Sequence, residues 1–458
     1  MSATVRESKA DALRKAPGPK GLPVLGSILD LRREGVLTFY LDMWREYGDV
    51  VRLEVGPITM HQFVRPEHVH HILVKNSENY VKGFSHDKLR VPLGSGLFTS
   101  VGTLWRRQRR LMGPTYTPKG VTQFADVVVD ATQKMLERWQ SEFEGRALAI
   151  NTEMMRLTMS VISRSMFNLD VGEEYAEVGE AISFILEFAN KRTLSLVDPP
   201  MSFPTPMNRR MKRAQETLDA FIYGIISERR RQPQRGDLLD TLMHARDEET
   251  GEVMSEQQLR DELLITFFAG HETTAQLLTW TWYLLSQHSD VEKQFHGELD
   301  RVLAGRSPAQ DHVDTLTYTR MLIDEALRLY SPVAMVARDV VEDDEIDGYA
   351  IPAGSIVTIT PYITHRHPEF WENPEAFDPG HFAPDRVEAR PRYAYYPFGA
   401  GPRICLGKYF ALQEAVLVLA EVGRRYQLRL LPGQQVDVEW AGTLRPAHDV
   451  MMDLEQRT

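Results

Sequence analysis

The feature that most constrains the fold is an apolar helical pattern that runs from Ser255 to about Ser286. Ser255 is a suitable N-cap, and Gln258 stands three residues later, as in the capping box that opens many helices. About 31 residues at 1.5 Å each make a helix roughly 47 Å long, which must cross the interior. Gly270 lies near its middle. Because glycine costs about 1 kcal/mol in a helix, we expect a distortion or a close approach of another segment there.

The rest of the chain predicts a mainly α protein with small β-sheets. Alternating apolar residues around Gly56-Pro57 predict a hairpin over residues 51–60. The pattern is mostly helical from about residue 66 to 330. Strand character returns over 349–360, and a proline-rich irregular stretch continues to about residue 404.

Composition excludes some classes of function. The chain has 458 residues, 43% of them hydrophobic and 26% charged, which are globular proportions. The net charge of -11 argues against general nucleic-acid binding, since affinity for a polyanion comes mainly from lysine and arginine. A single cysteine fits a reducing compartment, and no long apolar stretch predicts a transmembrane segment, so we expect a cytoplasmic protein. We expect a polar N-terminal segment over residues 1–16 and a single domain over 17–458.

The only cysteine lies in a loop that favours a thiolate. The sequence Phe398-Gly399-Ala400-Gly401-Pro402-Arg403-Ile404-Cys405-Leu406-Gly407 comes just before an apolar helical run over residues 406–422. Glycines let the backbone turn tightly beside a flat ligand, a helix N-terminus directs amide groups at a sulfur anion, and Arg403 adds positive charge. A lone cysteine is more often a small buried hydrophobic residue, but this context does not fit that alternative.

A polar patch interrupts the middle of the long helix, in Ala269-Gly270-His271-Glu272-Thr273-Thr274. Glu272 and Thr273 offer an acid and an alcohol that can relay protons through water, which is general acid catalysis at a buried site. The alternative is an ordinary helix with a polar patch. His271 and Glu272 also begin like the zinc motif His-Glu-x-x-His, but Ala275 stands in place of the second histidine.

These two segments resemble the cytochrome P450 family. The loop matches the family pattern Phe-x-x-Gly-x-Arg-x-Cys-x-Gly at every fixed position, and residues 269–274 are similar to the family's oxygen-activation sequence. The resemblance implies a cytochrome P450 fold, with haem b between the long central helix and the cysteine loop and with Cys405 as the axial ligand of the iron. It assigns cofactor binding to Phe398, Arg403, Cys405 and Gly407.

A charged pair with an unusual third partner extends the likeness. Glu325 and Arg328 stand three apart on one helix face, where they can pair. They are similar to the family's Glu-x-x-Arg core, which implies that they brace the haem loop. The family usually has Pro-Glu-Arg-Phe further on, whereas this chain has Pro379-Gly380-His381-Phe382. His381 then stands where an arginine is expected, and whether it replaces that arginine is open because imidazole is shorter and not always charged.

The resemblance also places partners for the haem propionates. Trp105, Arg109 and Arg338 stand where family members hold these carboxylates, and arginine offers them forked, charge-assisted hydrogen bonds. Taken alone, Trp105 is as well explained as a core residue with an exposed basic neighbour.

The resemblance implies a monooxygenase that inserts one oxygen atom from O2 into an apolar small molecule. Fatty acids, terpenoids, steroids and polyketides all suit such a site. Two rival classes are a haem-thiolate enzyme that uses or isomerises a peroxide, against which Glu272 and Thr273 argue, and a non-catalytic haem sensor, which needs no proton relay. The candidate substrate residues, which core packing explains about as well, are Phe98, Phe267, Ala269, Val333 and Met335.

Electrons are expected from a separate ferredoxin or flavodoxin with its reductase, because the chain has no flavin or nicotinamide signature. Arg106, Arg107 and Arg110 cluster around the propionate candidates, and Lys408 follows the cysteine loop. By resemblance they lie on one side of the haem, where positive charge would steer an acidic partner. The alternative is a solvated charged face.

Overall fold

The computed structural model describes residues 13–143, 145–169, 175–193, 199–234, 236–246 and 251–457. The chain forms two compact units. The first, here called the sheet unit, comprises the described residues of Met1–Asp87, Val333–Ala376 and Glu388–Cys405. The second, here called the helical unit, comprises those of Lys88–Pro332, Phe377–Val387 and Leu406–Thr458. The expected segment over residues 1–16 is described only from residue 13, and the single domain over 17–458 stays a prediction.

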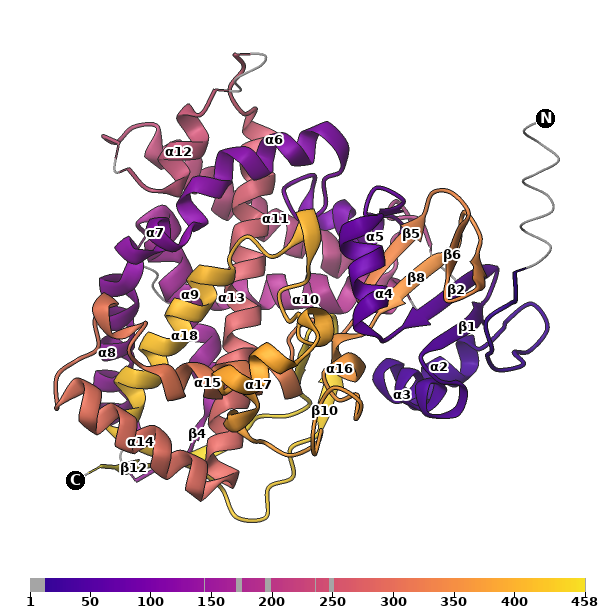
Figure 1. Ribbon diagram of the computed structural model, residues 1–458. Helices are drawn as coiled ribbons and strands as arrows, with labels where there is room; N and C mark the ends of the chain where they lie inside the picture. Colours follow the sequence, from indigo (N-terminus) through magenta and orange to yellow (C-terminus); the bar gives the residue numbers. More distant parts are fainter. Residues whose placement is uncertain are drawn as a thin grey trace. The chain divides into compact units, whose positions relative to one another are not determined.

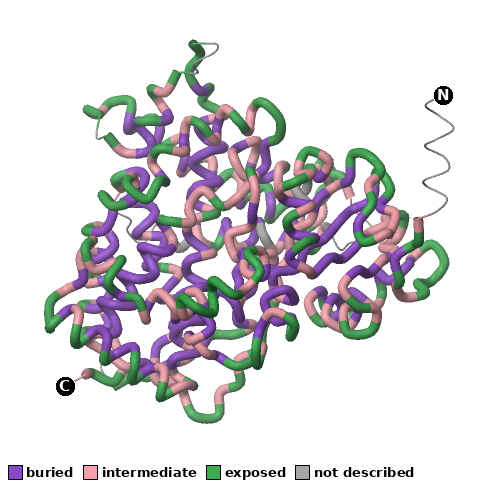
Figure 2. Tube along the Cα trace, in the orientation of Figure 1, coloured by how far each residue is buried: buried purple, intermediate pink, exposed green. Residues whose placement is uncertain are grey.

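The sheet unit is built on a five-stranded sheet in the order β1-β2-β8-β5-β3. Figure 1 labels β1, β2, β8 and β5 of this sheet. β1 and β2 form the hairpin predicted over residues 51–60, with Val55 opposite Ile58. β2 and β8 run parallel, and the other neighbouring strands are antiparallel. All four residues of β8 are buried, as expected for a central strand covered on both faces (Figure 2). The elements of this unit are α2 (Ile28–Glu34), α3 (Val36–Tyr47), β1 (Val50–Val55), β2 (Ile58–Phe63), α4 (Pro66–His70), the π-helix η1 (His71–Lys75), β3 (Tyr80–Val81), β5 (Val336–Val340), β6 (Asp344–Ile346), β7 (Tyr349–Ile351), β8 (Ile356–Ile359), α16 (Pro361–Thr364), η6 (Arg392–Ala394) and η7 (Gly401–Arg403).

The helical unit is organised around α13 (Glu256–Gln287), a helix of 32 residues that confirms the long helix expected from the sequence. Ser255 caps it, because its hydroxyl oxygen accepts a hydrogen bond from the Gln258 amide at 3.1 Å. The helix is continuous through Gly270. A Cβ there would lie 2.6 Å from the Ile162 side chain of α9 (Ile150–Phe167), so the expected close approach is confirmed and the distortion is not.

Further helices and small sheets surround α13. α18 (Lys408–Gly423) confirms the apolar helix predicted after the cysteine loop, and it contacts α8 (Ala125–Glu142), α13 and α15 (Thr317–Leu329). Its residues are all buried from Leu412 to Gly423, because most of them are apolar and they lie on every side of the helix. The remaining elements of this unit are α6 (Gly102–Met112), η2 (Gly113–Tyr116), α7 (Pro118–Val121), η3 (Thr122–Phe124), α8 (Ala125–Glu142), β4 (Leu148–Ala149), α10 (Tyr175–Thr193), α11 (Pro206–Arg229), α12 (Leu238–His244), α14 (Ser289–Leu303), η4 (Gln310–His312), α15 (Thr317–Leu329), η5 (Pro379–Phe382), β9 (Tyr426–Leu430), β10 (Val438–Trp440), β11 (Leu444–Pro446) and β12 (Met451–Gln456).

Two short helices, α5 (Phe84–Leu93) and α17 (Pro384–Ala389), include residues of both units. The expected fold class, mainly α with small β-sheets, is confirmed. Within the described part of the chain, none of the helices has both the length and the apolar character that a membrane span requires.

Candidate functional site

The Cys405 loop of the sheet unit has a backbone that glycine makes possible. Gly399 and Gly401 have φ angles of 71° and 66°, in the left-handed region that favours glycine. A Cβ at Gly401 would also lie 1.8 Å from the Leu73 carbonyl oxygen of η1. The Cys405 amide donates to the Phe398 carbonyl at 2.9 Å, which closes the loop, and the Cys405 side chain is exposed. The loop therefore presents its thiol on a tightly fixed turn.

In the sheet unit, two arginines lie close enough to Lys82 for their charges to act on it. Arg338 is 7% exposed, and burial lowers its pKa to about 10. Its guanidinium donates to the Ala337 carbonyl at 2.7 Å, and no described carboxylate pairs with it. Burial, and then the charges of Arg338 and Arg403, lower the pKa of Lys82 well below its ordinary value. A cationic cluster with one buried and two half-buried members fits an anionic group such as the carboxylates of a haem.

Lys82 is a residue that the sequence interpretation missed. It directly follows β3, in which Val81 pairs with Asp339, the neighbour of Arg338 on β5. This pairing joins residues more than 250 positions apart, so only the fold brings the two cations together. A cation at the end of a two-residue strand gives no signal of its own in the sequence.

The middle of α13 is uncovered on one face. Ala269 is exposed, and Phe268, Gly270 and Thr273 are half-buried, although most residues of this helix are buried. The Thr273 hydroxyl donates to the Ala269 carbonyl at 2.8 Å. The helical unit therefore offers a small-residue face, carrying one hydroxyl, on which a flat ligand can lie.

Glu272 points away from that face, because successive helix residues are turned by about 100°. It is 2% exposed, and one oxygen of its carboxylate accepts a hydrogen bond from the Thr443 hydroxyl. Burial raises the pKa of Glu272, while the Thr443 hydrogen bond and the charge of Arg445 lower it, with a net rise. Thr443 is a second residue that the sequence interpretation missed, since it lies 171 positions after its partner.

Glu325, Arg328 and His381 meet in the helical unit. Arg328 makes a forked contact, donating to both Glu325 oxygens at 2.7 and 2.8 Å. The Nδ1 atom of His381 lies 3.0 Å from Glu325 Oε1, and the Asp378 amide donates to the same oxygen at 2.9 Å. Burial raises the pKa of Glu325, but the hydrogen bonds from Arg328 and His381 outweigh it and hold the pKa below its ordinary value. His381 therefore contacts Glu325, at the position where the family usually has an arginine. Whether it replaces that arginine in function stays a prediction.

Phe98 and Phe267 have different surroundings in the helical unit. Phe98 is half-buried, and its ring centroid lies 6.2 Å from that of Phe268. The loop that carries it is fixed to α13, because the Leu97 amide donates to Glu262 at 2.9 Å. Phe267 is buried and stacks on Phe167 at 4.5 Å. Core packing accounts for Phe267, so its place in a substrate pocket stays a prediction.

The other candidates are distributed over both units. In the helical unit, Trp105 and Arg109 are half-buried one turn apart on α6, on the same side of the helix, and Gly407 is the N-cap of α18. In the sheet unit, Val333 is exposed and Met335 is half-buried just before β5. The roles assigned to these residues stay predictions.

Comparison with known proteins agrees with these features. The model of the family "Cytochrome P450" matches residues 16–448. Cyclooctat-9-en-7-ol 5-monooxygenase of Streptomyces melanosporofaciens is 35% identical, with coverage of 91% of this chain and 90% of that protein. Cyclooctatin synthase of the same organism is 33% identical, with 92% of each chain covered. Pentalenene oxygenase of Streptomyces avermitilis is 29% identical, with coverage of 96% and 97%.

Solved structures give the same result. The haem domain of cytochrome P450DA matches with a TM-score of 0.88 at 27% identity, covering 97% of this chain and 98% of that one. The retinoic acid-bound cyanobacterial CYP120A1 matches with a TM-score of 0.86 at 25% identity, covering 97% and 100%. The chain therefore belongs to the cytochrome P450 family: it is a monooxygenase with haem b as its cofactor, and it uses O2, an apolar small molecule and electrons from a redox partner.

Proposed function

We propose that Cys405 supplies the thiolate ligand of the haem and that the enzyme oxidises a terpenoid. The observation that carries the proposal is the exposed Cys405 thiol on a turn that two glycines with positive φ make possible. When bound, a haem with a thiolate ligand supplies the cleavage of the O–O bond of dioxygen.

We infer that the cationic cluster of the sheet unit binds carboxylates. The charges of Arg338 and Arg403 both act on Lys82, so the three cations lie near one another, and their combined positive charge favours an anion. We assign the haem propionates to this cluster. By the resemblance, Trp105 and Arg109 of α6 take part in the same task.

Glu272 and Thr273 have separate tasks in supplying protons. The Thr273 hydroxyl lies on the uncovered face of α13, where it orients a water or donates a proton. Glu272 is buried with a raised pKa, so it holds a proton more readily than an exposed glutamate does and can donate it. The acid and the alcohol therefore act in sequence and not as one group.

The terpenoid assignment rests on the relatives. Two of them are named for oxidation of cyclooctat-9-en-7-ol and pentalenene. In this chain, Phe98, Phe268 and Ala269 provide an apolar surface around the middle of α13. An apolar surface suits a hydrocarbon skeleton, which is positioned by shape and not by charge.

The test is spectroscopic. The reduced carbon monoxide complex of the wild-type protein is expected to show the thiolate-type band, and Cys405→Ala is expected to lose it because no other cysteine is present. Substrate-induced shifts of the haem spectrum then rank cyclic terpenoids against fatty acids and steroids. Retention of the band in Cys405→Ala overturns the ligand assignment, and tighter binding of fatty acids or steroids overturns the substrate class. Product formation that does not need added reductant would favour a peroxide-using enzyme.

We further propose a ferredoxin or flavodoxin type electron donor that docks on α6. Arg106 and Arg110 are exposed, whereas Arg107 is half-buried and donates to the Glu252 carbonyl at 3.2 Å. Exposed arginines on one helix attract an acidic partner and raise its rate of association at low salt. Of the α6 arginines, Arg106 and Arg110 are therefore the ones best placed to meet a partner.

Charge reversal tests the docking proposal. Arg106→Glu with Arg110→Glu should slow reduction by an acidic carrier and flatten its dependence on ionic strength, with substrate affinity unchanged. Arg213→Glu, an exposed arginine on α11, is the matched control and should leave the reduction rate unchanged. Equal reduction rates for the α6 variant and the wild type across ionic strength would place the docking surface elsewhere.

A further inference from the structure

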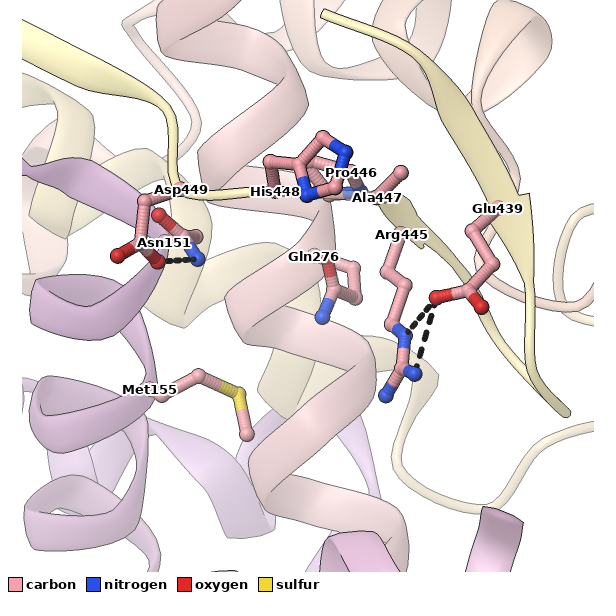
Figure 3. A pocket seen from close by; sticks show the side chains of 9 residues that line it. All are labelled: Asn151, Met155, Gln276, Glu439, Arg445, Pro446, Ala447, His448 and Asp449. Carbon is pink, nitrogen blue, oxygen red and sulfur yellow. Dashed lines mark hydrogen bonds and ion pairs between the residues drawn. The ribbon is translucent and has the colours of Figure 1, made fainter.

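A polar pocket of about 240 Å³ opens in the helical unit beside α13. Figure 3 shows Gln276 of α13 between Met155 of α9 and Arg445 of the β10–β11 hairpin. Water occupies roughly 30 Å³ per molecule in the liquid, so the pocket has room for several. The residues that line it are Asn151, Met155, Gln276, Glu439, Arg445, Pro446, Ala447, His448 and Asp449.

Two buried hydrogen-bond acceptors lie near this pocket: one lines it, and the other is one helical turn away on α13. Gln276 is 6% exposed and lines the pocket, and Glu272 precedes it by four residues on the same side of α13. In the described part of the chain, neither Gln276 Oε1 nor Glu272 Oε2 has a hydrogen-bond donor. Buried acceptors of this kind are normally satisfied by ordered water. The natural source of that water is the pocket.

The hairpin links the pocket to the Glu272 carboxylate. Thr443 directly precedes β11, and Arg445 lies in it two residues later, so both side chains point to the same face of the hairpin. Thr443 donates to Glu272, and the charge of Arg445 acts on the same carboxylate. Arg445 also pairs with the exposed Glu439 at 3.0 Å. One face of the hairpin thus holds Glu272 and forms a wall of the pocket.

The outer rim of the pocket is charged and in contact with solvent. His448 and Asp449 are exposed, and Asn151 of α9 donates to Asp449 at 3.0 Å. With Glu439 and Arg445, these groups offer water hydrogen-bond partners at the rim, while Gln276 is the buried polar group at the pocket's inner end. Polar groups therefore run from the solvent to within one helical turn of Glu272.

We propose that this pocket is the water inlet through which protons reach Glu272 from solvent, with Gln276 and Arg445 as positioning residues for the water chain. The inference rests on the proposed role of Glu272 as a proton donor. Each proton that the Glu272 carboxyl gives up is replaced by one from a pocket water, and that water takes one from the solvent. Charge and atoms therefore balance over each delivery, and no other reactant is needed.

The experiment follows the exchange of the Glu272 proton without turnover. The infrared carbonyl band of the protonated carboxyl, assigned by its loss in Glu272→Gln, shifts when the holoenzyme is transferred to deuterated water, and rapid mixing gives the rate. Gln276→Met keeps the side-chain length but removes the polar group, and Ala447→Phe fills the pocket. Both should slow the exchange by on the order of 100-fold, the lower end of what a positioned proton-transfer group contributes.

Two control variants distinguish a blocked water path from a general loss of structure. Gln276→Asn keeps a polar group and should exchange at nearly the wild-type rate, and Ala353→Phe makes the same change as Ala447→Phe at an exposed position of the sheet unit. Under turnover, Gln276→Met should form less product per electron while its carbon monoxide band stays intact. Wild-type exchange rates in both Gln276→Met and Ala447→Phe overturn the inlet, even where the thiolate band supports the proposed function. Loss of that band in the wild-type protein would instead overturn the proposed function.

Discussion

At the scale of single residues, the Glu325 carboxylate is a point where three hydrogen-bond donors converge. Arg328, His381 and the Asp378 amide all contact it, and both Glu325 and Arg328 are fully buried. His381→Ala should lower the free energy of unfolding by about 1.5–3 kcal/mol, the usual worth of a hydrogen bond to a charged group. His381→Arg should retain stability and haem, because it keeps a donor beside the carboxylate.

Chemical denaturation of the holoenzyme and the rate of haem loss measure both effects. Arg386→Ala removes an exposed ion pair with Asp378 and serves as the control, with an expected change below about 1 kcal/mol. A His381→Ala variant as stable as the wild type would mean that the histidine does not support Glu325. Faster haem loss from His381→Arg would show that arginine cannot copy the geometry of the imidazole.

Thr273 gives the second prediction at this scale. Thr273→Ala should keep haem and substrate binding while forming less product per electron consumed, because its hydroxyl lies on the uncovered face of α13. Thr279→Ala is the matched control, since Thr279 makes the same hydrogen bond to the preceding turn but is buried. Unchanged coupling in Thr273→Ala would make Thr273 an ordinary helix residue.

At the scale of elements, the contact between η1 and the Cys405 loop sets the shape of the loop. Gly401→Ala places a Cβ against the Leu73 carbonyl and keeps a positive φ, whereas Gly399→Ala meets no atom within 4 Å and adds only backbone strain. We expect Gly399→Ala to cost about 1–2 kcal/mol and Gly401→Ala clearly more. Thermal unfolding and haem retention of the two variants measure which substitution costs more stability. Equal losses would show that the loop can move away from η1.

The elements differ in how far the sequence predicts them. The capping serine and the apolar pattern of α13 are local signals, so its first and last residues are predicted closely. The Cys405 motif is local as well. Lys82 and Thr443 were not predicted, because strand pairing and hairpin packing bring them to neighbours that lie 171 or more positions away in the sequence. Gly270 shows the same limit, since the sequence did not tell a bent helix from a close neighbour, here Ile162.

At the scale of the whole molecule, three buried histidines are expected to lower the stability of the folded protein in acid. Burial lowers the pKa values of His61, His271 and His296 to about 4. The unfolded chain binds these protons near pH 6.5 and the folded chain does not, so stability is lost as pH falls from about 6.5 towards 4. We expect the free energy of unfolding to decline between pH 6.5 and 4. Below about pH 4 these three histidines should cause no further decline, because the folded and unfolded chains both bind the protons.

His61→Leu tests this window. Neither ring nitrogen of His61 has a partner in the described part of the chain, so the variant should be at least as stable as the wild type at neutral pH. Its decline between pH 6.5 and 4 should be smaller by up to about 3 kcal/mol, since one pKa unit corresponds to about 1.4 kcal/mol. Denaturant titrations at a series of pH values measure the difference. Identical acid profiles would show that folded His61 takes up its proton as readily as unfolded His61.

The hydrogen bond between Thr443 and Glu272 has a consequence for protein engineering. A chimaera that takes residues 438–446 from a relative replaces the β10–β11 hairpin. It thereby also replaces Thr443, the hydrogen-bond partner of Glu272 on α13. Such a graft can fold and bind well and still waste reducing equivalents. Retaining threonine at position 443 and arginine at position 445 in the transplanted hairpin should restore the amount of product formed per electron. These two positions are therefore the first to hold constant in a library.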